Sequence, residues 1–390
     1  MSVTVTSTES WGSRLGGAFK GILVGLGLFI AGFPVLFWNE GRTVKTRTAL
    51  EEGAGVCVEV ESNAKVDPEM DGELVHMTGL ADTKEVLCDE QFGVSNVAIS
   101  LCRTVEMYQW NETSTTTEKK NMGGSVTKTT TYDYEKGWYS RAIDSSSFHE
   151  AGHDNPGRMD WENGELFASE VTFGAFRLNE RQIRSIGRAQ ALTLPADLAC
   201  PVEHVQISGS TIYVPNAETR RNPLNTRTVA SQPRIGDQRI SYRVVTPHEI
   251  SIIAKQKGAT FTSYKAKNGK LVALLEDGVM SPEEMFDAAQ SANTLMCWVL
   301  RLVGFLLMYW GLSAVFRPLS VLADVLPILG TIVGIGTNLV AGLLAFVCAL
   351  VTIAVAWLFY RPVLSCVLLG IAAAVVWLLW QKRRSARPEA

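Results

Sequence analysis

Hydrophobic residues gather at the two ends of this chain, and a largely polar stretch separates them. Near the N-terminus, residues 21–38 form a run of 18 residues without a charged side chain. At about 1.5 Å of rise per residue, a helix of this length covers ~27 Å, close to the thickness of the hydrocarbon core of a bilayer. The pattern predicts a first transmembrane helix after a short N-terminal segment, residues 1–20.

A secretory signal peptide is the alternative interpretation of this first run. Arg14 and Lys20 precede it, as basic residues do in a signal peptide. The run is longer than a typical signal-peptide core, however, and no small-residue cleavage site follows Trp38. We therefore expect an uncleaved anchor.

Glycines recur every fourth residue at the start of this helix, at Gly17, Gly21 and Gly25. Small residues at this spacing let a second helix approach closely, although glycine is frequent in membrane helices in general. The spacing makes these glycines candidates for helix packing.

The C-terminal hydrophobic region predicts three further spans, which are residues 294–316, 338–360 and 363–380. Arg361 and Pro362 form a tight turn between the last two spans. Polar residues and prolines interrupt residues 317–337, so we expect an interfacial or re-entrant segment there. A basic tail, residues 381–390, follows the last span.

Basic residues in this tail predict the orientation, because cytoplasmic flanks of membrane helices are enriched in lysine and arginine. Four crossings then place both termini in the cytoplasm and residues 39–293 on the other side. That side is the lumen of the endoplasmic reticulum (ER) or nuclear envelope in a eukaryote, and the periplasm or exterior in a bacterium. Arg42, Lys45 and Arg47 lie just beyond the first span and argue the other way, but a long translocated domain weakens such local charges.

The pattern of residues in the polar region, residues 39–293, predicts a β-rich domain. From Val97 to Gln109, apolar and polar residues alternate, which indicates a strand buried on one face. Two threonine-rich stretches, residues 113–119 and 125–134, flank Asn121-Met122-Gly123-Gly124 and predict a hairpin. We expect further strands, and a helix opened by Pro282; the strands are residues 73–79, 237–245, 250–256 and 270–275.

The predicted fold class is therefore a multi-span α-helical membrane protein with one N-terminal plus three C-terminal transmembrane helices and a large β-rich α+β extramembrane domain. Composition agrees, because 47% of the residues are hydrophobic and only 19% are charged. The net charge of −3, without a basic stripe outside the tail, argues against nucleic-acid partners.

Four cysteines lie in the polar region, at Cys57, Cys88, Cys102 and Cys200. An even number in a compartment that permits oxidation makes them candidates for disulfide bonds, with three pairings open. No C-x-x-C pair occurs in the sequence, so a zinc ribbon or redox dithiol motif is absent.

The sequence His149-Glu150-Ala151-Gly152-His153 matches the H-E-x-x-H pattern of zinc proteases. There His149 and His153 would bind the metal, and Glu150 would activate water. The pattern needs a continuous helix, whereas three serines precede it and Asp154-Asn155-Pro156-Gly157 follows it. We favour a turn with a structural histidine, with no metal or other cofactor, and keep a membrane-anchored zinc hydrolase as the alternative.

One charged residue, Arg301, falls inside the second predicted span. A charge at the centre of a span costs about 2.5 to 3.5 kcal/mol on insertion scales, and less near the interface. Arg301 is expected to snorkel or to find a partner, and the functional alternative is a polar contact within the bundle or with lipid headgroups.

Eight short motifs are spread along nearly the whole chain. They are Trp38-Asn39-Glu40-Gly41-Arg42, Leu74-Val75-His76, Val105-Glu106-Met107-Tyr108-Gln109-Trp110, Gly152-His153 with Asn155-Pro156, Gly236-Asp237, Ile253-Ala254-Lys255-Gln256, Leu300-Arg301, and Trp357-Leu358-Phe359-Tyr360-Arg361-Pro362. No single motif is diagnostic, but their order around the helix layout is specific. Together they resemble the transmembrane protein 43 (LUMA) family.

The resemblance implies a non-enzymatic scaffold of the ER and inner nuclear membrane in animals, with self-association and partners such as emerin and lamins. Bacterial relatives would sit in the cytoplasmic membrane and have no lamina partner. Membrane lipids are partners in either case. A lipid-binding membrane module that uses the helix bundle is a further alternative.

Overall fold

A computed structural model describes residues 2–221, 228–363, 367 and 377. The chain divides into two compact units. A β-rich unit comprises residues 1–5, 52–117 and 129–286, and a helical unit comprises residues 6–51, 118–128 and 287–390.

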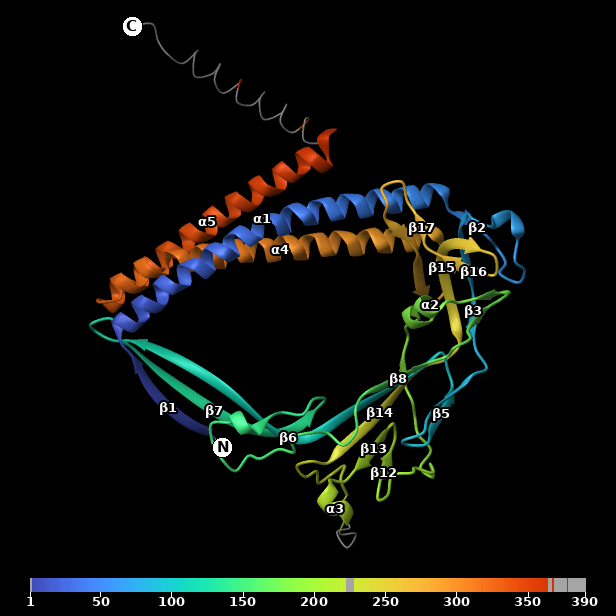
Figure 1. The fold of residues 1–390 in the computed structure, drawn as a ribbon, viewed down its shortest axis with the longest axis horizontal. Helices are drawn as coiled ribbons and strands as arrows, with labels where there is room; N and C mark the ends of the chain where they lie inside the picture. The colour runs from blue at the N-terminus through green and yellow to red at the C-terminus, as the bar shows by residue number, and fades with distance from the viewer. Residues whose placement is uncertain (1, 222–227, 364–366, 368–376, 378–390) are drawn as a thin grey trace. The chain divides into compact units, whose positions relative to one another are not determined.

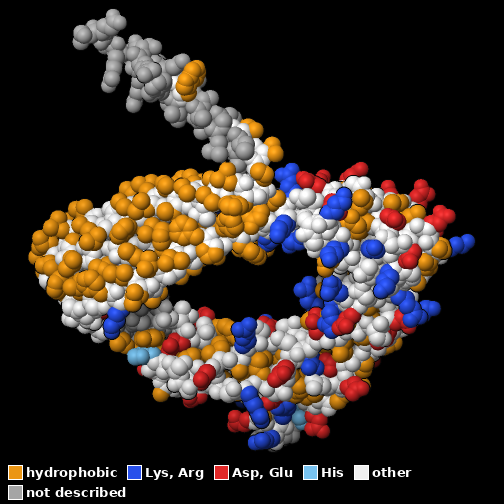
Figure 2. Space-filling view, turned by 45° about the horizontal axis from the view of Figure 1, so that its top comes forward, with side chains coloured by type: hydrophobic (Ala, Val, Ile, Leu, Met, Phe, Trp, Pro, Cys, Tyr) orange, Lys and Arg blue, Asp and Glu red, His pale blue; other side chains and the backbone are white. Residues whose placement is uncertain are grey.

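Three long helices dominate the helical unit (Figure 1). They are α1 (Trp11–Val56), α4 (Pro282–Ala323) and α5 (Pro327–Tyr360), and each is long and apolar enough to cross a membrane. Large hydrophobic side chains remain exposed along them and cover the helices in Figure 2. Such a surface is stable in contact with lipid, which confirms the predicted class of α-helical membrane protein with a large β-rich domain.

The predicted number of C-terminal spans is not borne out. The described residues contain two long C-terminal helices, α4 and α5, where three spans were expected. The last predicted span, residues 363–380, lies almost wholly outside the described residues.

The predicted interfacial segment, residues 317–337, is not a separate element. Helix α4 continues through Pro318 to Ala323, and α5 begins at Pro327 after a short turn. Proline is tolerated inside membrane helices where neighbouring groups satisfy the freed carbonyl, so Pro318 does not end α4. The sequence identified the break at residues 324–327, and the apolar residues on either side of it belong to α4 and α5.

Glycines spaced seven residues apart hold α1 and α4 together. A Cβ added to Gly25 would lie 2.6 Å from the carbonyl oxygen of Gly311, and one added to Gly32 would lie 3.0 Å from that of Gly304. Two glycines on each helix thus let the backbones touch. Of the three predicted packing glycines, only Gly25 lies in this contact, because nothing lies within 4 Å of a Cβ added to Gly17 or Gly21.

Helix α5 presents a row of small residues to the bundle. These residues recur at intervals of about one turn, so a single face of α5 is buried. Ala345 and Ala349 form a small core with Leu36 of α1 and Met308 of α4. The buried residues of this row are Ala341, Ala345, Ala349, Thr352 and Ala356.

A polar cluster closes the end of the helical unit where α4 turns into α5. Asp324, in that turn, has a side chain only 1% exposed and accepts hydrogen bonds from Arg14 of α1 and from Lys120, whose Nζ lies 2.6 Å away. Burial pushes the pKa of Asp324 up, but Lys120 and Arg14 outweigh burial and leave the pKa below its usual range. The carboxylate is therefore charged at neutral pH.

The tip of a β-hairpin takes part in the same cluster. The Gly123 amide donates to the carbonyl of Val325 at 3.1 Å, and Arg14 donates to the carbonyl of Gly124 at 2.5 Å. Arg14, before the first predicted span, and Lys120, in the polar region after it, thus share the Asp324 carboxylate. The predicted orientation, with residues 1–20 and 39–293 on opposite sides of a membrane, stays a prediction that these contacts make worth measuring.

The β-rich unit is built around two sheets. The first contains β6 (Ser100–Lys120), whose residues 100–107 pair antiparallel with β14 (Gln238–Val245), and the second pairs β3 (Leu74–Asp82) with β15 (His248–Lys257). The remaining strands are β1 (Ser2–Glu9), β2 (Val58–Glu59), β4 (Val86–Asp89), β5 (Val94–Val97), β7 (Val126–Tyr139), β8 (Gly164–Phe167), β9 (Thr172–Phe173), β10 (Phe176–Arg177), β11 (Gln190–Ala191), β12 (Gln206–Ser208), β13 (Thr211–Val214), β16 (Thr260–Thr262), β17 (Tyr264–Lys265), β18 (Leu271–Val272) and β19 (Leu274–Asp277).

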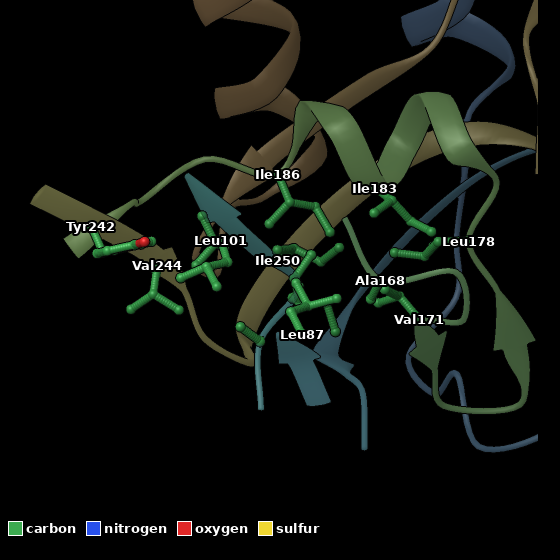
Figure 3. Close-up of a cluster of buried hydrophobic side chains, with 14 of the residues drawn as sticks. Leu87, Leu101, Ala168, Val171, Leu178, Ile183, Ile186, Tyr242, Val244 and Ile250 are labelled. Carbon is green, nitrogen blue, oxygen red and sulfur yellow. The ribbon is translucent and has the colours of Figure 1, made fainter. Parts of the chain in front are cut away.

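In the described part of this unit, two short α-helices accompany the strands, α2 (Glu180–Ser185) and α3 (Ala217–Arg221). Side chains from both sheets and from α2 form one hydrophobic core, with Leu101, Val244, Ile183 and Ile250 among its members (Figure 3). The burial of Leu101, Val105 and Met107 follows the predicted alternation along β6. Local periodicity thus located the central strands of this unit.

We predict that Gly25→Ala destabilises the helical unit while Gly21→Ala does not. The new methyl group at position 25 would meet the backbone of α4, and such overpacking costs about 1 to 3 kcal/mol. A methyl group at position 21 meets no atom within 4 Å, and alanine favours helix. Melting temperatures of the detergent-purified variants measure this difference, and equal values would contradict the glycine contact.

We also predict that Cys residues introduced at Thr8 and Met122 react from the same side of sealed vesicles. Both positions are exposed. Thr8 is close in sequence to Arg14, and Met122 is close in sequence to Lys120, the two residues that bond Asp324. The measurement uses a membrane-impermeant maleimide on variants whose native cysteines are serine. Labelling of the two positions from opposite sides would show that the hairpin tip does not meet the N-terminal segment in a membrane.

Candidate functional site

Glu40 of α1 is the centre of a polar network inside the helical unit. Its side chain is fully buried, and both of its oxygens are engaged. Arg301 of α4 donates through Nε at 2.6 Å and through Nη2 at 3.0 Å, and the indole of Trp357 on α5 donates at 2.8 Å. One carboxylate therefore joins all three long helices.

The rest of the network orients these groups. The Asn39 side-chain amide donates to the carbonyl of Cys297 at 3.0 Å, and that of Asn293 donates to the carbonyl of Thr43 at 3.1 Å. These two bonds cross between α1 and α4 in opposite directions. The guanidinium of Arg301 also lies 4.8 Å from the centre of the Trp298 ring.

Gly41 allows α5 to approach α1 at the same level. A Cβ added to Gly41 would lie 2.5 Å from Cζ of Tyr360, so any side chain there would displace the Tyr360 ring. The Tyr360 ring also packs 5.4 Å from the ring of Phe37. Three of the motifs that carry the family resemblance, around residues 39–42, 300–301 and 357–362, thus meet in space.

This arrangement is suited to holding helices together. A buried carboxylate is stable only when a countercharge and hydrogen bonds replace its lost hydration. Glu40 has both, and Arg301 and Trp357 occupy its oxygens. Arg301 therefore makes a polar contact within the bundle, which was one of the alternatives considered from the sequence. Its neighbour at the same carboxylate, Trp357, could not be identified from the sequence pattern.

Further family-motif residues lie together in the β-rich unit. Asn155 accepts a hydrogen bond from the Trp110 amide and donates to the Trp110 carbonyl, at 2.8 and 2.9 Å. Glu106 pairs with Arg239 at 2.7 Å, and the Tyr108 ring lies 5.3 Å from that of Trp138. These contacts fix loops and strands to one another.

Pro156, Arg361 and Pro362 complete the family-motif residues and also have local roles. A Cβ added to Gly236 would lie 3.1 Å from Pro156, so the two loops are in close contact. The backbone amide of Arg361 bonds the carbonyl of Trp357 and ends α5, and Pro362 follows it.

The H-E-x-x-H sequence lies in bends and turns, without the helix that a zinc protease needs. His153 is buried and stacks on Tyr134 with ring centres 4.0 Å apart, while His149 stacks separately on Tyr132 at 4.3 Å. The Glu150 backbone amide donates to the Tyr134 hydroxyl at 3.0 Å. The two imidazoles are thus engaged with different aromatic rings, as expected for structural histidines.

Tyr134 connects this turn to the hairpin. Its hydroxyl donates to Glu112 at 2.5 Å. Desolvation and this hydrogen bond raise the pKa of Tyr134, so the phenol remains protonated at neutral pH. In the described part of the chain, no group of three or more His, Cys, Asp or Glu side chains is placed to hold a metal ion.

The candidate disulfide cysteines are free thiols in the structure. Cys57, Cys88, Cys102 and Cys200 are all unbonded. Burial raises the pKa of the Cys57 thiol to about 11, and burial likewise raises the pKa values of Cys102 and Cys200. These three thiols are consequently protonated and unreactive at neutral pH.

A cavity of about 310 Å³ lies in the β-rich unit beside Cys88 and Tyr242. Three polar residues of its lining are paired with one another, because Arg103 donates to both oxygens of Asp89 and the Tyr242 hydroxyl donates to Asp89 at 2.7 Å. Burial and the bond to Asp89 raise the pKa of Tyr242. The pairing identifies these groups as structural.

Comparisons with known proteins agree over nearly the full length. The sequence profile of the family described as Transmembrane protein 43 matches residues 107–362. The chain is 36% identical to Transmembrane protein 43 of Mus musculus over 398 residues, with 99% of this chain and 96% of that protein covered. It is 34% identical to the Homo sapiens protein (95% and 92% covered) and 30% identical to the Drosophila melanogaster homolog (91% and 93% covered). No solved structure matches the chain.

We predict that Glu40→Gln destabilises the helical unit by about 3 to 5 kcal/mol, because it leaves the buried charge of Arg301 without a partner. Adding Arg301→Met should recover much of the loss, since both charges are then gone. The control is Glu51→Gln, which breaks an exposed pair with Arg47 and should change stability by less than about 1 kcal/mol. Tryptophan fluorescence during denaturation in detergent measures all three, and a harmless Glu40→Gln would contradict the network.

Proposed function

Because this chain belongs to the Transmembrane protein 43 family, we propose that it is a non-enzymatic integral membrane scaffold that holds a β-rich domain at a membrane and organises the membrane around it. Its location is the ER and inner nuclear membrane if the source is eukaryotic, and the cytoplasmic membrane if it is bacterial. Its partners are membrane lipids and further copies of the chain, with emerin- and lamin-type proteins added in a nuclear envelope.

The Glu40 network is the observation that carries this proposal. The Glu40 carboxylate, the Arg301 guanidinium and the Trp357 indole come from three different helices, and the last two donate their hydrogen bonds to Glu40. A catalytic acid or base needs an open face toward a substrate, whereas both oxygens of Glu40 are occupied. The occupied carboxylate supports the role of a rigid membrane anchor.

The β-rich unit supports the same function. His149 and His153 stack on separate tyrosines, and the network of Asp89, Arg103 and Tyr242 is internally paired. These are side chains that could act in catalysis or metal binding, and here they make contacts that stabilise the fold. A domain of this kind offers a fixed surface to partners.

Crosslinking in native membranes tests the proposal. We predict that a short lysine-reactive crosslinker captures a second copy of the chain and, from a nuclear envelope, lamina-associated proteins. Glu40→Gln, which loosens the anchor, should reduce these products, and Glu51→Gln should not. Only monomers with unrelated neighbours in both the wild type and the control would contradict the scaffold.

Metal analysis distinguishes the scaffold from the zinc-hydrolase alternative. The scaffold predicts no stoichiometric zinc in the purified protein, and no change when His149 and His153 are replaced by alanine. One zinc per chain, lost in that double variant, would overturn the non-enzymatic assignment.

A further inference from the structure

The outer edge of strand β19 (Leu274–Asp277) in the β-rich unit has no partner strand. Among the described residues, β19 pairs with β15 alone, from Leu274 opposite Ile253 to Asp277 opposite Ile250. The amides and carbonyls of a strand point alternately to its two sides, so part of the backbone of β19 points away from β15. Such an edge can pair with a further extended chain.

A groove lies between this edge and helix α2. One cavity of about 350 Å³ is lined by Arg181, Gln182 and Ser185 of α2 and by residues 273–276. A second cavity, of about 370 Å³, shares Arg181, Gln182 and Ala273 with the first. The two cavities therefore form one continuous groove beside β19.

The wall that α2 forms is held in place by the fold. Ile183 of α2 points into the hydrophobic core (Figure 3). The side chain of Asn179 caps α2, and its amide donates to the carbonyl of Phe261 at 3.0 Å. Just after α2, the Gly187 amide donates to the Asp277 carboxylate at 3.1 Å and ties the helix to the end of the strand. The groove is thus formed without a ligand.

Charged side chains along the groove define the ligand. Arg181 borders both cavities, is exposed, and forms no ion pair among the described residues, whereas Arg184 of the same helix pairs with Glu180 at 3.0 Å. Glu276 is also exposed and lines one of the two cavities. The groove therefore suits a chain that brings a carboxylate to Arg181 and a neutral or basic residue to Glu276.

The apolar part of the lining leaves room for a ligand side chain. Alternate side chains of an added strand would point to the side of the sheet on which α2 lies. The lining there includes Ala254 and Ala273, which have small side chains, and the half-buried Leu275. An apolar ligand side chain would cover these three residues.

We propose that the edge of β19 binds an extended peptide segment of another protein, which adds a strand to the sheet and places a carboxylate against Arg181. Main-chain hydrogen bonds to β19 supply the affinity, and Arg181 and the apolar lining supply the selectivity. The proposal does not rest on the scaffold function, because it requires only the edge and the groove of the β-rich unit.

Binding of synthetic peptides to the purified full-length chain in detergent tests the site. The probes are fluorescent hexapeptides of alternating valine and threonine in which one position in turn carries glutamate or glutamine, and fluorescence anisotropy measures their affinity. We expect a glutamate peptide to bind about two- to fivefold more tightly than its glutamine counterpart, as for an exposed ion pair. Arg181→Gln should remove this preference, whereas Arg184→Gln, which changes an arginine already paired with Glu180, should retain it.

Methylation of the peptide backbone nitrogens tests the strand pairing without changing the protein. Alternate amides of a bound strand face β19 and the others face away from it. Methylating one alternate set should therefore weaken binding by about tenfold or more, because its hydrogen bonds to β19 are lost. Methylating the other set should leave the affinity within about twofold of the unmodified peptide.

Several results would overturn the proposal. They are equal effects of the two methylated sets, a preference for glutamate that survives Arg181→Gln, and the absence of binding by every peptide. A second copy of the chain is the other occupant that the edge could take. An intermolecular disulfide between Glu276→Cys chains in membranes, together with no peptide binding, would assign the edge to self-association and reject the peptide.

Discussion

The ion pair between Glu40 and Arg301 is the contact on which the helical unit depends. In lipid, apolar helices gain little from hiding apolar surface against one another, so close packing and polar contacts must supply the association. Glu40 joins α1, α4 and α5 at one point. Because its side chain is fully buried, it is stable there only while its partners are in place. Removing either charge alone would leave the other charge uncompensated in the bundle.

The glycine seam makes this contact geometrically possible. Gly25 and Gly32 on α1 face Gly311 and Gly304 on α4, which lets the two backbones touch over two turns. Gly41 does the same for the Tyr360 ring of α5. A close approach at these positions brings long polar side chains within hydrogen-bond distance, so packing and electrostatics depend on each other.

Sequence patterns located the hydrophobic helices and the central strands because both depend on local periodicity. They did not show which face of α1 meets α4, and therefore Gly17 and Gly21 were grouped with Gly25. They also could not pair Asp324 with Arg14 and Lys120, because residues 310 and 204 positions apart in sequence leave no local signal. Pro318 was read as a break, whereas α4 continues through it. The charge at Arg301 was detectable from sequence, but its partner was not.

Two arginines of the helical unit differ in how their guanidinium groups are paired. The Nε and Nη2 atoms of Arg301 donate to Glu40, whereas those of Arg42 have no hydrogen-bond partner among the described residues. The direct test of the central claim is the distance between spin labels at Leu26 of α1 and Val351 of α5, both exposed, measured by pulsed electron paramagnetic resonance in lipid nanodiscs. A single narrow distance in the wild type that broadens in Glu40→Gln is expected. An unchanged narrow distribution in that variant would show that Glu40 does not hold the helices together.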